Sequence, residues 1–244
     1  MLEVMQYRKV KKYKRYFTTD LNTRSILYFD KDLLHKIPFK IFDNSEAVLK
    51  YIYKLKCEEL IEIKRLIYKN NLLVGYSIKN YKKYKSLKKL RHRKFEIKKN
   101  DCFKIVHAFN TLSHNNLSYS DFHSGNILLN PKNNDIKICD LDSFSIKNNK
   151  ELNRDELRKI LILLLAYLYN IKNFDIRNVI YSSGVDIPDA FINYCCKAKW
   201  DITIEKIYEI INKIKHNDIE NERPYILEKS KQLCALGYEK YSRY

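Results

Sequence analysis

The most informative segment of this chain is Leu117-Ser-Tyr-Ser-Asp121-Phe-His123-Ser-Gly125-Asn126-Ile-Leu-Leu129, followed by Ile136-Lys-Ile-Cys-Asp140-Leu-Asp142. Asn126 lies five residues after Asp121, a hydrophobic run comes next, and a second short hydrophobic run ends at Asp140. This pattern predicts a loop, a strand, a turn and a strand that deliver oxygen-bearing side chains to one place. Phosphoryl transfer needs such groups: a carboxylate near the attacking hydroxyl, and an Asn and a carboxylate that hold magnesium.

Length and composition indicate an ordinary globular protein. The chain has 244 residues, enough for one large domain with a real core. Residues 1–14 are too polar for a secretory signal, and the longest apolar run, residues 160–169, is too short to span a bilayer. The six cysteines show no Cys-x-x-Cys spacing. We therefore expect reduced thiols and a cytoplasmic protein without a membrane span.

The formal net charge of +18 favours an anionic partner, such as a nucleotide, a nucleic acid, membrane headgroups or an acidic protein. The chain is also rich in Lys, Asn, Ile and Tyr, and it has only four Gly and four Pro. This composition is typical of an AT-rich genome, which would make many surfaces basic without a functional reason. The sequence contains no nucleic-acid-binding motif, so we do not expect a nucleic-acid partner.

The N-terminal part predicts a β-meander and one helix. Strands are expected at residues 13–17, 25–29, 33–37, 62–68 and 71–76. A helix is expected to begin near Asp43, because apolar residues then recur at helical spacing. The polar residues 77–87 predict a connector to the second half of the chain.

From about Leu87 the apolar spacing becomes helical. The clearest amphipathic helix covers residues 157–168, and Asn153 with Glu156 resembles a capping box at its start. Further helices are expected at residues 189–197, 203–215 and 224–235. Strands in the first half and helices in the second predict an α+β fold.

The segment from Asp121 to Asp142 resembles the protein-kinase-like superfamily, which includes protein kinases, aminoglycoside phosphotransferases and choline kinases. Asp121-Phe-His-Ser-Gly-Asn-Ile-Leu resembles the Asp-Leu-His-x-Gly-Asn-Ile-Leu form of the catalytic loop. Ile138-Cys-Asp-Leu-Asp142 resembles the Ile-Asp-x-Asp variant that replaces Asp-Phe-Gly. These forms are commoner in atypical bacterial or viral-type kinases and small-molecule kinases than in typical protein kinases. The resemblance implies a bilobal fold, with a small β-rich N-lobe at residues 1–80 and a helical C-lobe at residues 81–244.

The resemblance also implies roles for single residues in an ATP- and magnesium-dependent phosphotransferase. Asp121 would be the catalytic base, and Asn126 and Asp140 would hold magnesium. Lys36, on the third strand, would contact the α- and β-phosphates of ATP. Glu46, at the start of the following helix, is the best candidate for the ion-pair partner of Lys36.

Three neighbouring residues, Lys79, Asn80 and Tyr81, would contact adenine as the hinge. Asp155 resembles the buried Asp that braces the catalytic loop from below. Gly125 is one of only four glycines, which predicts a backbone position with positive φ.

Several assignments stay open at the level of sequence. Lys40 is the alternative to Lys36, and Glu58 and Glu59 are alternatives to Glu46. Asp142 either binds metal or caps the turn, and His123 either contacts phosphate or braces the loop.

Departures from the family pattern leave the acceptor and the activity open. The expected phosphate-covering loop, residues 18–23, has no glycine, and only residues 141–154 separate Asp140 from Asp155. The short segment favours a small or unusual substrate. The sequence leaves two acceptors open, a protein Ser/Thr or a small-molecule hydroxyl. The missing glycines favour an alternative, a non-catalytic pseudokinase or scaffold that binds nucleotide or an acidic partner.

Overall fold

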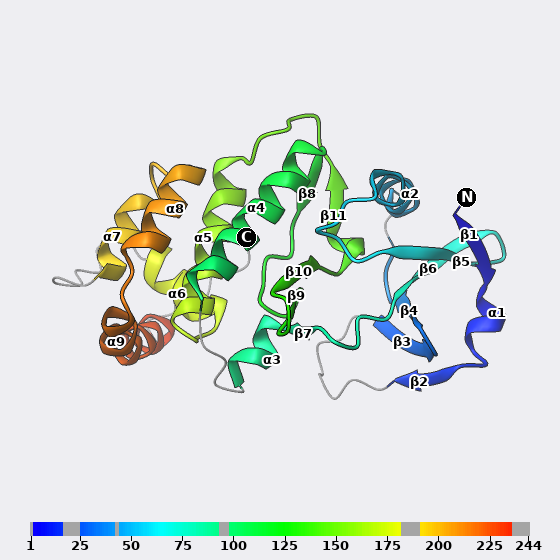
Figure 1. The fold of residues 1–244 in the computed structure, drawn as a ribbon, viewed down its shortest axis with the longest axis horizontal. Coiled ribbons are helices and arrows are strands. Elements are labelled where there is room, and N and C mark those ends of the chain that lie inside the picture. The colour runs from blue at the N-terminus through cyan, green and yellow to red at the C-terminus, as the bar shows by residue number, and fades with distance from the viewer. Residues whose placement is uncertain (1, 17–24, 42–43, 93–97, 182–190, 236–244) are drawn as a thin grey trace.

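The computed structural model describes residues 2–16, 25–41, 44–92, 98–181 and 191–235, and the fold is mixed α+β. Figure 1 shows the first six strands with two helices at one end of the molecule and most helices towards the other end. The N-terminal elements are β1 (Glu3–Gln6), α1 (Tyr7–Val10), β2 (Lys14–Tyr16), β3 (Ser25–Asp30), β4 (Leu33–Pro38), α2 (Ser45–Leu55), β5 (Ile63–Lys69) and β6 (Leu72–Lys79).

The remaining elements mix short strands with longer helices. They are β7 (Lys85–Ser86), α3 (Leu87–His92), α4 (Lys99–His114), β8 (Leu117–Tyr119), β9 (Ile127–Asn130), β10 (Asp135–Ile138), the 3₁₀ helix η1 (Leu141–Ser143), β11 (Phe144–Ile146), α5 (Arg154–Leu168), α6 (Asn173–Tyr181), α7 (Phe191–Ala198), α8 (Ile204–Lys213) and α9 (His216–Ala235). Among the helices of the described residues, none combines the length and apolar character that crossing a membrane requires.

The six N-terminal strands form one sheet in the order β1-β5-β6-β4-β3-β2. The five strands expected from the sequence correspond to β2 to β6, and β2, β3 and β4 form the predicted antiparallel meander. The β5–β6 hairpin joins this meander because β6 pairs with β4. The sequence did not predict β1, which pairs in parallel with β5 at the edge, or the short helix α1.

Asparagines take positions in this glycine-poor chain where glycine is usual. Asn70 and Asn71 form the two-residue turn between β5 and β6, with φ angles of 50° and 62°. Two-residue hairpin turns favour positive φ at both positions, and Asn tolerates the left-handed region better than most residues. The hairpin therefore closes without glycine.

The two faces of the sheet belong to two cores, because successive side chains of a strand point to opposite faces. Leu66 of β5 packs into the main core together with α2. Its neighbour Ile67 packs into a small cluster that also contains Met5, Val10 and Tyr28. The main core continues from the α2 side of the sheet into the helical part of the molecule.

The connector expected at residues 77–87 is largely structured. Strand β6 continues to Lys79, and Lys85 and Ser86 form β7, which pairs with β9 in a separate three-stranded sheet. The segment just before β5 also contacts β10 directly, because the Ile61 amide donates a hydrogen bond to the Ile138 carbonyl at 3.1 Å. The N-terminal sheet is thus attached to β10, the strand that leads into Asp140.

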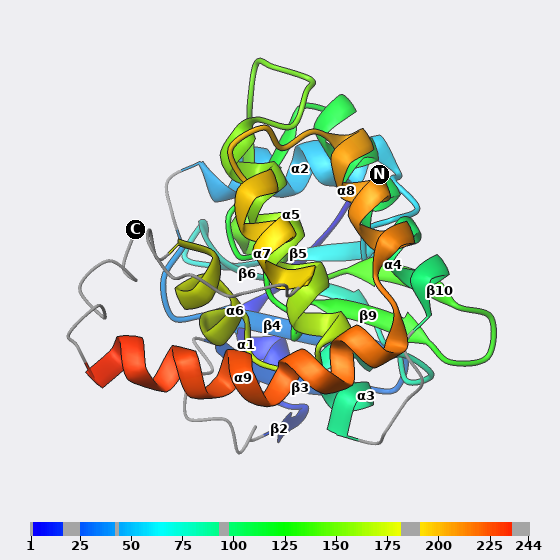
Figure 2. The same ribbon diagram turned by 90° about the vertical axis from the view of Figure 1, so that its left-hand side faces the viewer.

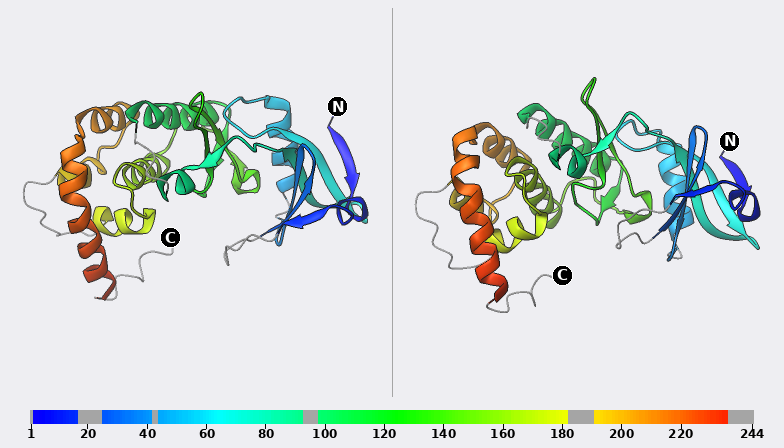
Figure 3. Two further views of the ribbon diagram at one scale, coloured as in Figure 1. Left: turned by 60° about the horizontal axis from the view of Figure 1, so that its bottom comes forward. Right: turned by 90° about the horizontal axis from the view of Figure 1, so that it is seen from below.

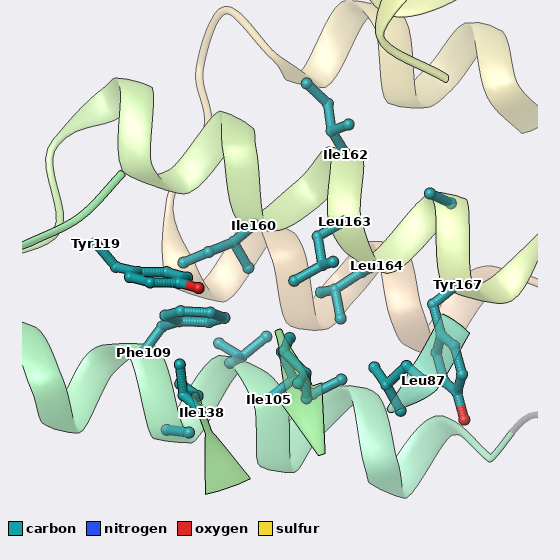
Figure 4. Packing of buried hydrophobic residues seen from close by; sticks show 14 of the residues in the cluster. Leu87, Ile105, Phe109, Tyr119, Ile138, Ile160, Ile162, Leu163, Leu164 and Tyr167 are labelled. Atoms are coloured by element: carbon teal, nitrogen blue, oxygen red, sulfur yellow. The ribbon is translucent and has the colours of Figure 1, made fainter. Parts of the chain in front are cut away.

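Helix α5 lies at the centre of the helical part, and the expectation of an amphipathic helix was wrong for most of its length. Every residue from Ile160 to Leu168 is buried. Figure 4 shows Leu163 and Leu164 pointing towards Ile105 of α4, while Ile162 points to the opposite side. A helix that is apolar on all sides is one enclosed by neighbours.

The C-terminal helices cover α5 from outside. Helix α9 packs against α6 and α7 and crosses below them in Figure 2. Both views in Figure 3 place α9 at the end of the molecule farthest from the N-terminal sheet. The sequence missed α6, and it placed the start of the last helix at Pro224, whereas α9 begins at His216 and contains that proline.

Candidate active site

The loop between β8 and β9 holds its polar side chains together by short hydrogen bonds. The Asn126 Nδ2 donates to Asp121 Oδ2 at 2.9 Å and to the Asp121 carbonyl at 3.3 Å. The His123 Nε2 lies 3.2 Å from the same Asp121 oxygen. The Asp121 side chain is 49% exposed, so its carboxylate is held in place and remains accessible from solvent.

Gly125 leaves room for the His123 ring, and the expectation of a positive φ there was wrong. A Cβ atom on Gly125 would lie 2.7 Å from Cε1 and 2.8 Å from Nδ1 of His123. The Gly125 amide donates to that Nδ1 at 3.0 Å, which fixes the ring. Of the two roles considered for His123, the bracing of the loop is therefore visible in the structure.

Asp140 lies between β10 and η1 in the left-handed conformation, with φ of 67° and ψ of 53°. Its Oδ1 forms an ion pair with Lys36 Nζ, and its Oδ2 accepts a hydrogen bond from Ser143 Oγ at 2.6 Å. Asp142 Oδ1 also contacts Lys36 Nζ, at 2.6 Å, and accepts a bond of 2.5 Å from the Tyr76 hydroxyl. One lysine of β4 thus joins two carboxylates more than one hundred residues away in sequence.

The two carboxylates change the pKa values of Lys36 and Tyr76. Burial alone would lower the Lys36 pKa, but the charges of Asp142 and Asp140 and their hydrogen bonds outweigh burial and raise it. Burial and the same two carboxylates raise the pKa of Tyr76 well above its usual range. The ammonium is therefore charged and the phenol is neutral at physiological pH, so both act as hydrogen-bond donors to the carboxylates.

The structure places Lys36, and not Lys40, beside Asp140. Lys40 is exposed and lies beyond the end of β4. Gly75 of β6 lies against the backbone of Lys36, because a Cβ atom on Gly75 would lie 2.2 Å from the Lys36 carbonyl oxygen. Strand β6 can approach the backbone of Lys36 this closely only with glycine.

Glu46 was wrongly expected to pair with Lys36. Its carboxylate instead accepts a hydrogen bond from the Tyr68 hydroxyl at 2.8 Å and contacts Lys50 Nζ at 2.6 Å. Glu46 therefore ties α2 to β5. Within the described residues, the acidic partners of Lys36 are Asp140 and Asp142.

Asp155 was wrongly expected to brace the catalytic loop, because its side chain is 79% exposed. The next residue, Glu156, is buried, and it accepts hydrogen bonds from Ser118 Oγ at 2.6 Å and Lys147 Nζ at 2.8 Å. It also completes the predicted capping box, with the Asn153 amide 3.0 Å from its carboxylate. Glu156 thus connects the start of α5 to the strand that precedes Asp121.

The expected hinge residues follow directly on β6. The Lys79 amide donates to the Glu62 carbonyl and the Asn80 amide to the Asp32 carbonyl, at 3.1 and 2.8 Å. The Tyr81 hydroxyl accepts a bond from the Glu62 amide at 2.9 Å. Two of the expected adenine-binding N–H groups are thus engaged in the sheet region. The Asn80 Nδ2 is buried without a hydrogen-bond partner among the described residues.

The donor set fits magnesium. Mg²⁺ takes oxygen ligands, usually one or two carboxylates together with phosphate oxygens and water. Asp140 supplies a carboxylate, and Asn126, whose amide nitrogen faces Asp121, supplies an amide oxygen. The Cys139 amide donates to the Asn126 carbonyl at 2.9 Å, which keeps these two segments adjacent. No cluster of three His, Cys, Asp or Glu side chains suited to a metal occurs in the described part of the chain.

No protein-family model matches the sequence, and no curated protein matches it significantly. A function for this chain has to be inferred from the geometry of the site.

Proposed function

We propose that this protein is an ATP- and magnesium-dependent phosphotransferase of the protein-kinase-like superfamily. It moves the γ-phosphate of ATP to a hydroxyl group of a protein or a small molecule. In this proposal residues 1–80 are the nucleotide-covering N-lobe and residues 81–244 are the C-lobe. The change of strand partner between β6 and β7 supports a boundary near residue 80.

The observation that carries the proposal is the contact of Lys36 with Asp140 and Asp142. A lysine on a strand of one sheet and a carboxylate at the end of β10 are the pair that would flank nucleotide phosphates and their metal. Asp121 and Asn126 lie in the adjoining loop, in hydrogen-bond contact with each other. A surface turn would not need these five side chains in adjoining segments.

Each residue then has a specific task. Lys36 would neutralise phosphate charge, Asp140 and Asn126 would hold the magnesium, and Asp121 would orient the acceptor hydroxyl. Bound magnesium would neutralise charge on the phosphates as the leaving group departs. The acceptor oxygen forms a bond to the γ-phosphorus, the bond from this phosphorus to the β,γ-bridging oxygen breaks, and ADP leaves with its electron pair. The hydroxyl proton passes to the Asp121 carboxylate.

Two substitutions test the proposal. Asp121→Ala should leave ATP binding intact and lower γ-phosphate transfer or ATP hydrolysis by about 10²- to 10⁴-fold, the usual contribution of a general base. Asp140→Asn should abolish the magnesium-dependent part of ATP binding. Binding is measured by thermal shift with ATP in the presence and absence of magnesium, and turnover by release of labelled phosphate.

Asp201→Asn is the matched control, because Asp201 is an exposed carboxylate outside the site, and it should change neither measurement. Normal binding by Asp140→Asn would mean that Asp142 or another group is the metal ligand. Absence of both ATP binding and turnover in the wild-type protein would refute the enzyme and favour the non-catalytic scaffold. The loop at residues 18–23, on which that alternative rests, lies outside the described residues.

A further inference from the structure

A depression of about 400 Å³ opens beside the catalytic loop, on the side where α5 begins. Its lining comes from β8, the following loop and the first turns of α5, and it includes Ser120, Arg154, Asp155, Glu156 and Lys159. Ser120 directly precedes Asp121 in the chain, so the depression lies next to the loop that carries the expected catalytic base. None of the roles given above uses this space.

We propose that this depression binds an acidic side chain of a polypeptide acceptor and thereby presents a neighbouring Ser or Thr hydroxyl to Asp121. The proposal rests on the phosphotransferase function and names its substrate class. The group transferred and the path of the proton are those given above, with the acceptor oxygen supplied by the polypeptide.

The charges around the depression favour an anionic group. Arg154 and Lys159 are exposed and carry two positive charges to its wall. The Lys159 Nζ lies 5.9 Å from the centre of the Phe122 ring, so this charge is adjacent to the catalytic loop. The nearby carboxylates are balanced, since Glu156 is paired with Lys147 and Asp155 with Arg158.

An adjoining aromatic surface favours a polypeptide over a small molecule. Arg158, which pairs with Asp155 at 3.5 Å, places its guanidinium 5.4 Å from the centre of the Trp200 ring. Trp200 is 59% exposed and Tyr181 is 46% exposed, and Lys199 Nζ lies within 5.5 Å of both ring centres. Exposed Trp, Tyr and Arg are enriched where proteins bind proteins. A small hydroxyl compound seated in the depression would not use this surface.

The test measures binding and transfer separately. A fluorescein-labelled peptide with one serine among glutamates is titrated with nucleotide-free protein, and its fluorescence anisotropy is followed. The double variant Arg154→Glu/Lys159→Glu should bind the peptide about tenfold or more weakly, equivalent to about 1.4 kcal/mol. The control Lys69→Glu/Lys231→Glu makes the same charge change at exposed positions on β5 and α9, and it should bind within about twofold of wild type. Arg154→Gln/Lys159→Gln, a milder change, should give an intermediate loss.

Transfer of labelled phosphate to the peptide and ATP hydrolysis without peptide are then measured on the same proteins. The proposal expects loss of peptide phosphorylation in the Arg154/Lys159 variants with unchanged peptide-free hydrolysis. Equal peptide binding and phosphorylation by wild type and these variants would overturn it and leave the phosphotransferase function standing. Peptide binding that depends on Arg154 and Lys159, without any ATP turnover, would refute the phosphotransferase function. It would still support the depression as a binding site for acidic peptides. A single-stranded RNA that displaces the peptide and depends on the same residues would also overturn the proposal.

Discussion

At the scale of single residues, Asp140 shows how the site is held. Its left-handed backbone costs most residues about 1–2 kcal/mol, although Asp adopts it more readily than most. Hydrogen bonds from Ser143 and the ion pair with Lys36 fix the carboxylate in this conformation. The backbone thus turns just after β10, which brings Asp140 to Lys36.

The ionised carboxylate of Glu156 contributes to the stability of the fold. Burial would raise its pKa, but hydrogen bonds from Lys147, Ser118 and the Asn153 amide outweigh burial and lower it below 4.5. A pKa lower in the folded than in the unfolded chain means that the ionised carboxylate stabilises the fold above pH 4.5, and that this contribution is lost as the pH falls through the folded-state value. Glu156→Gln should therefore lower the free energy of unfolding by about 1–3 kcal/mol at pH 7.

Urea unfolding at pH 7 and near pH 4 measures this effect. The difference between wild type and Glu156→Gln should shrink at the lower pH, because the unfolded wild-type chain takes up a proton at Glu156 as the pH falls below about 4.5. Asp155→Asn alters the neighbouring exposed carboxylate and should cost less than about 0.5 kcal/mol. An equal difference at both pH values would show that folding does not lower the pKa of Glu156.

At the scale of elements, local signals located most strands and helices and misplaced some ends. The capping box at Asn153 and Glu156 is local, so spacing alone predicted it and the structure confirms it. The start of α9 was misplaced because proline is favoured at the first position of a helix. Packing of α9 against α6 and α7 instead holds eight residues before Pro224 in the helix.

This arrangement predicts the effect of Pro224→Ala. Proline inside a helix removes one backbone hydrogen bond and clashes with the preceding turn, at a cost of about 3 kcal/mol relative to alanine. Since α9 begins at His216, we expect the substitution to raise the free energy of unfolding by about 1–3 kcal/mol. Thermal and urea unfolding measure it. A neutral or destabilising result would instead place the start of the helix at the proline.

At the scale of the whole molecule, the chain carries a large excess of positive charge. The net charge of +18 opposes compaction through self-repulsion. Partly buried pairs such as Lys36 with Asp140 are screened by salt much less than exposed charges are. Added salt should therefore relieve repulsion at the surface more than it weakens the site.

We expect the midpoint of thermal unfolding to rise when NaCl is increased from about 0.01 M to about 1 M, because the Debye length falls from about 30 Å to about 3 Å. A gain of about 1 kcal/mol in the free energy of unfolding corresponds to a rise of about 2–4 °C in the thermal midpoint for a chain of this size. The double variant Lys69→Glu/Lys231→Glu carries less net positive charge, so its thermal midpoint should rise less with salt. A midpoint that is constant or falls with salt would mean that the positive charges are already balanced locally.

Local sequence was sufficient where the interaction partners are close in the chain. Asp121 and Asn126 lie five residues apart in one loop, so their spacing anticipated the contact between them. The partners of Lys36 lie more than one hundred residues away, and the choice between Lys36 and Lys40 depended on the tertiary structure: Lys36 lies on β4 and contacts Asp140, whereas Lys40 lies beyond the end of that strand.

The same distinction explains the two wrong site residues. Glu46 and Asp155 have the charge and place in sequence that their roles require, but helix rotation directs Glu46 to Tyr68 and leaves Asp155 in solvent. Adjacent residues on a helix point about 100° apart, so the neighbour of Asp155, Glu156, faces the interior. Residue types and spacing thus predicted the kind of chemistry expected of this chain. Packing in three dimensions decided which of the candidate side chains lie together at the site.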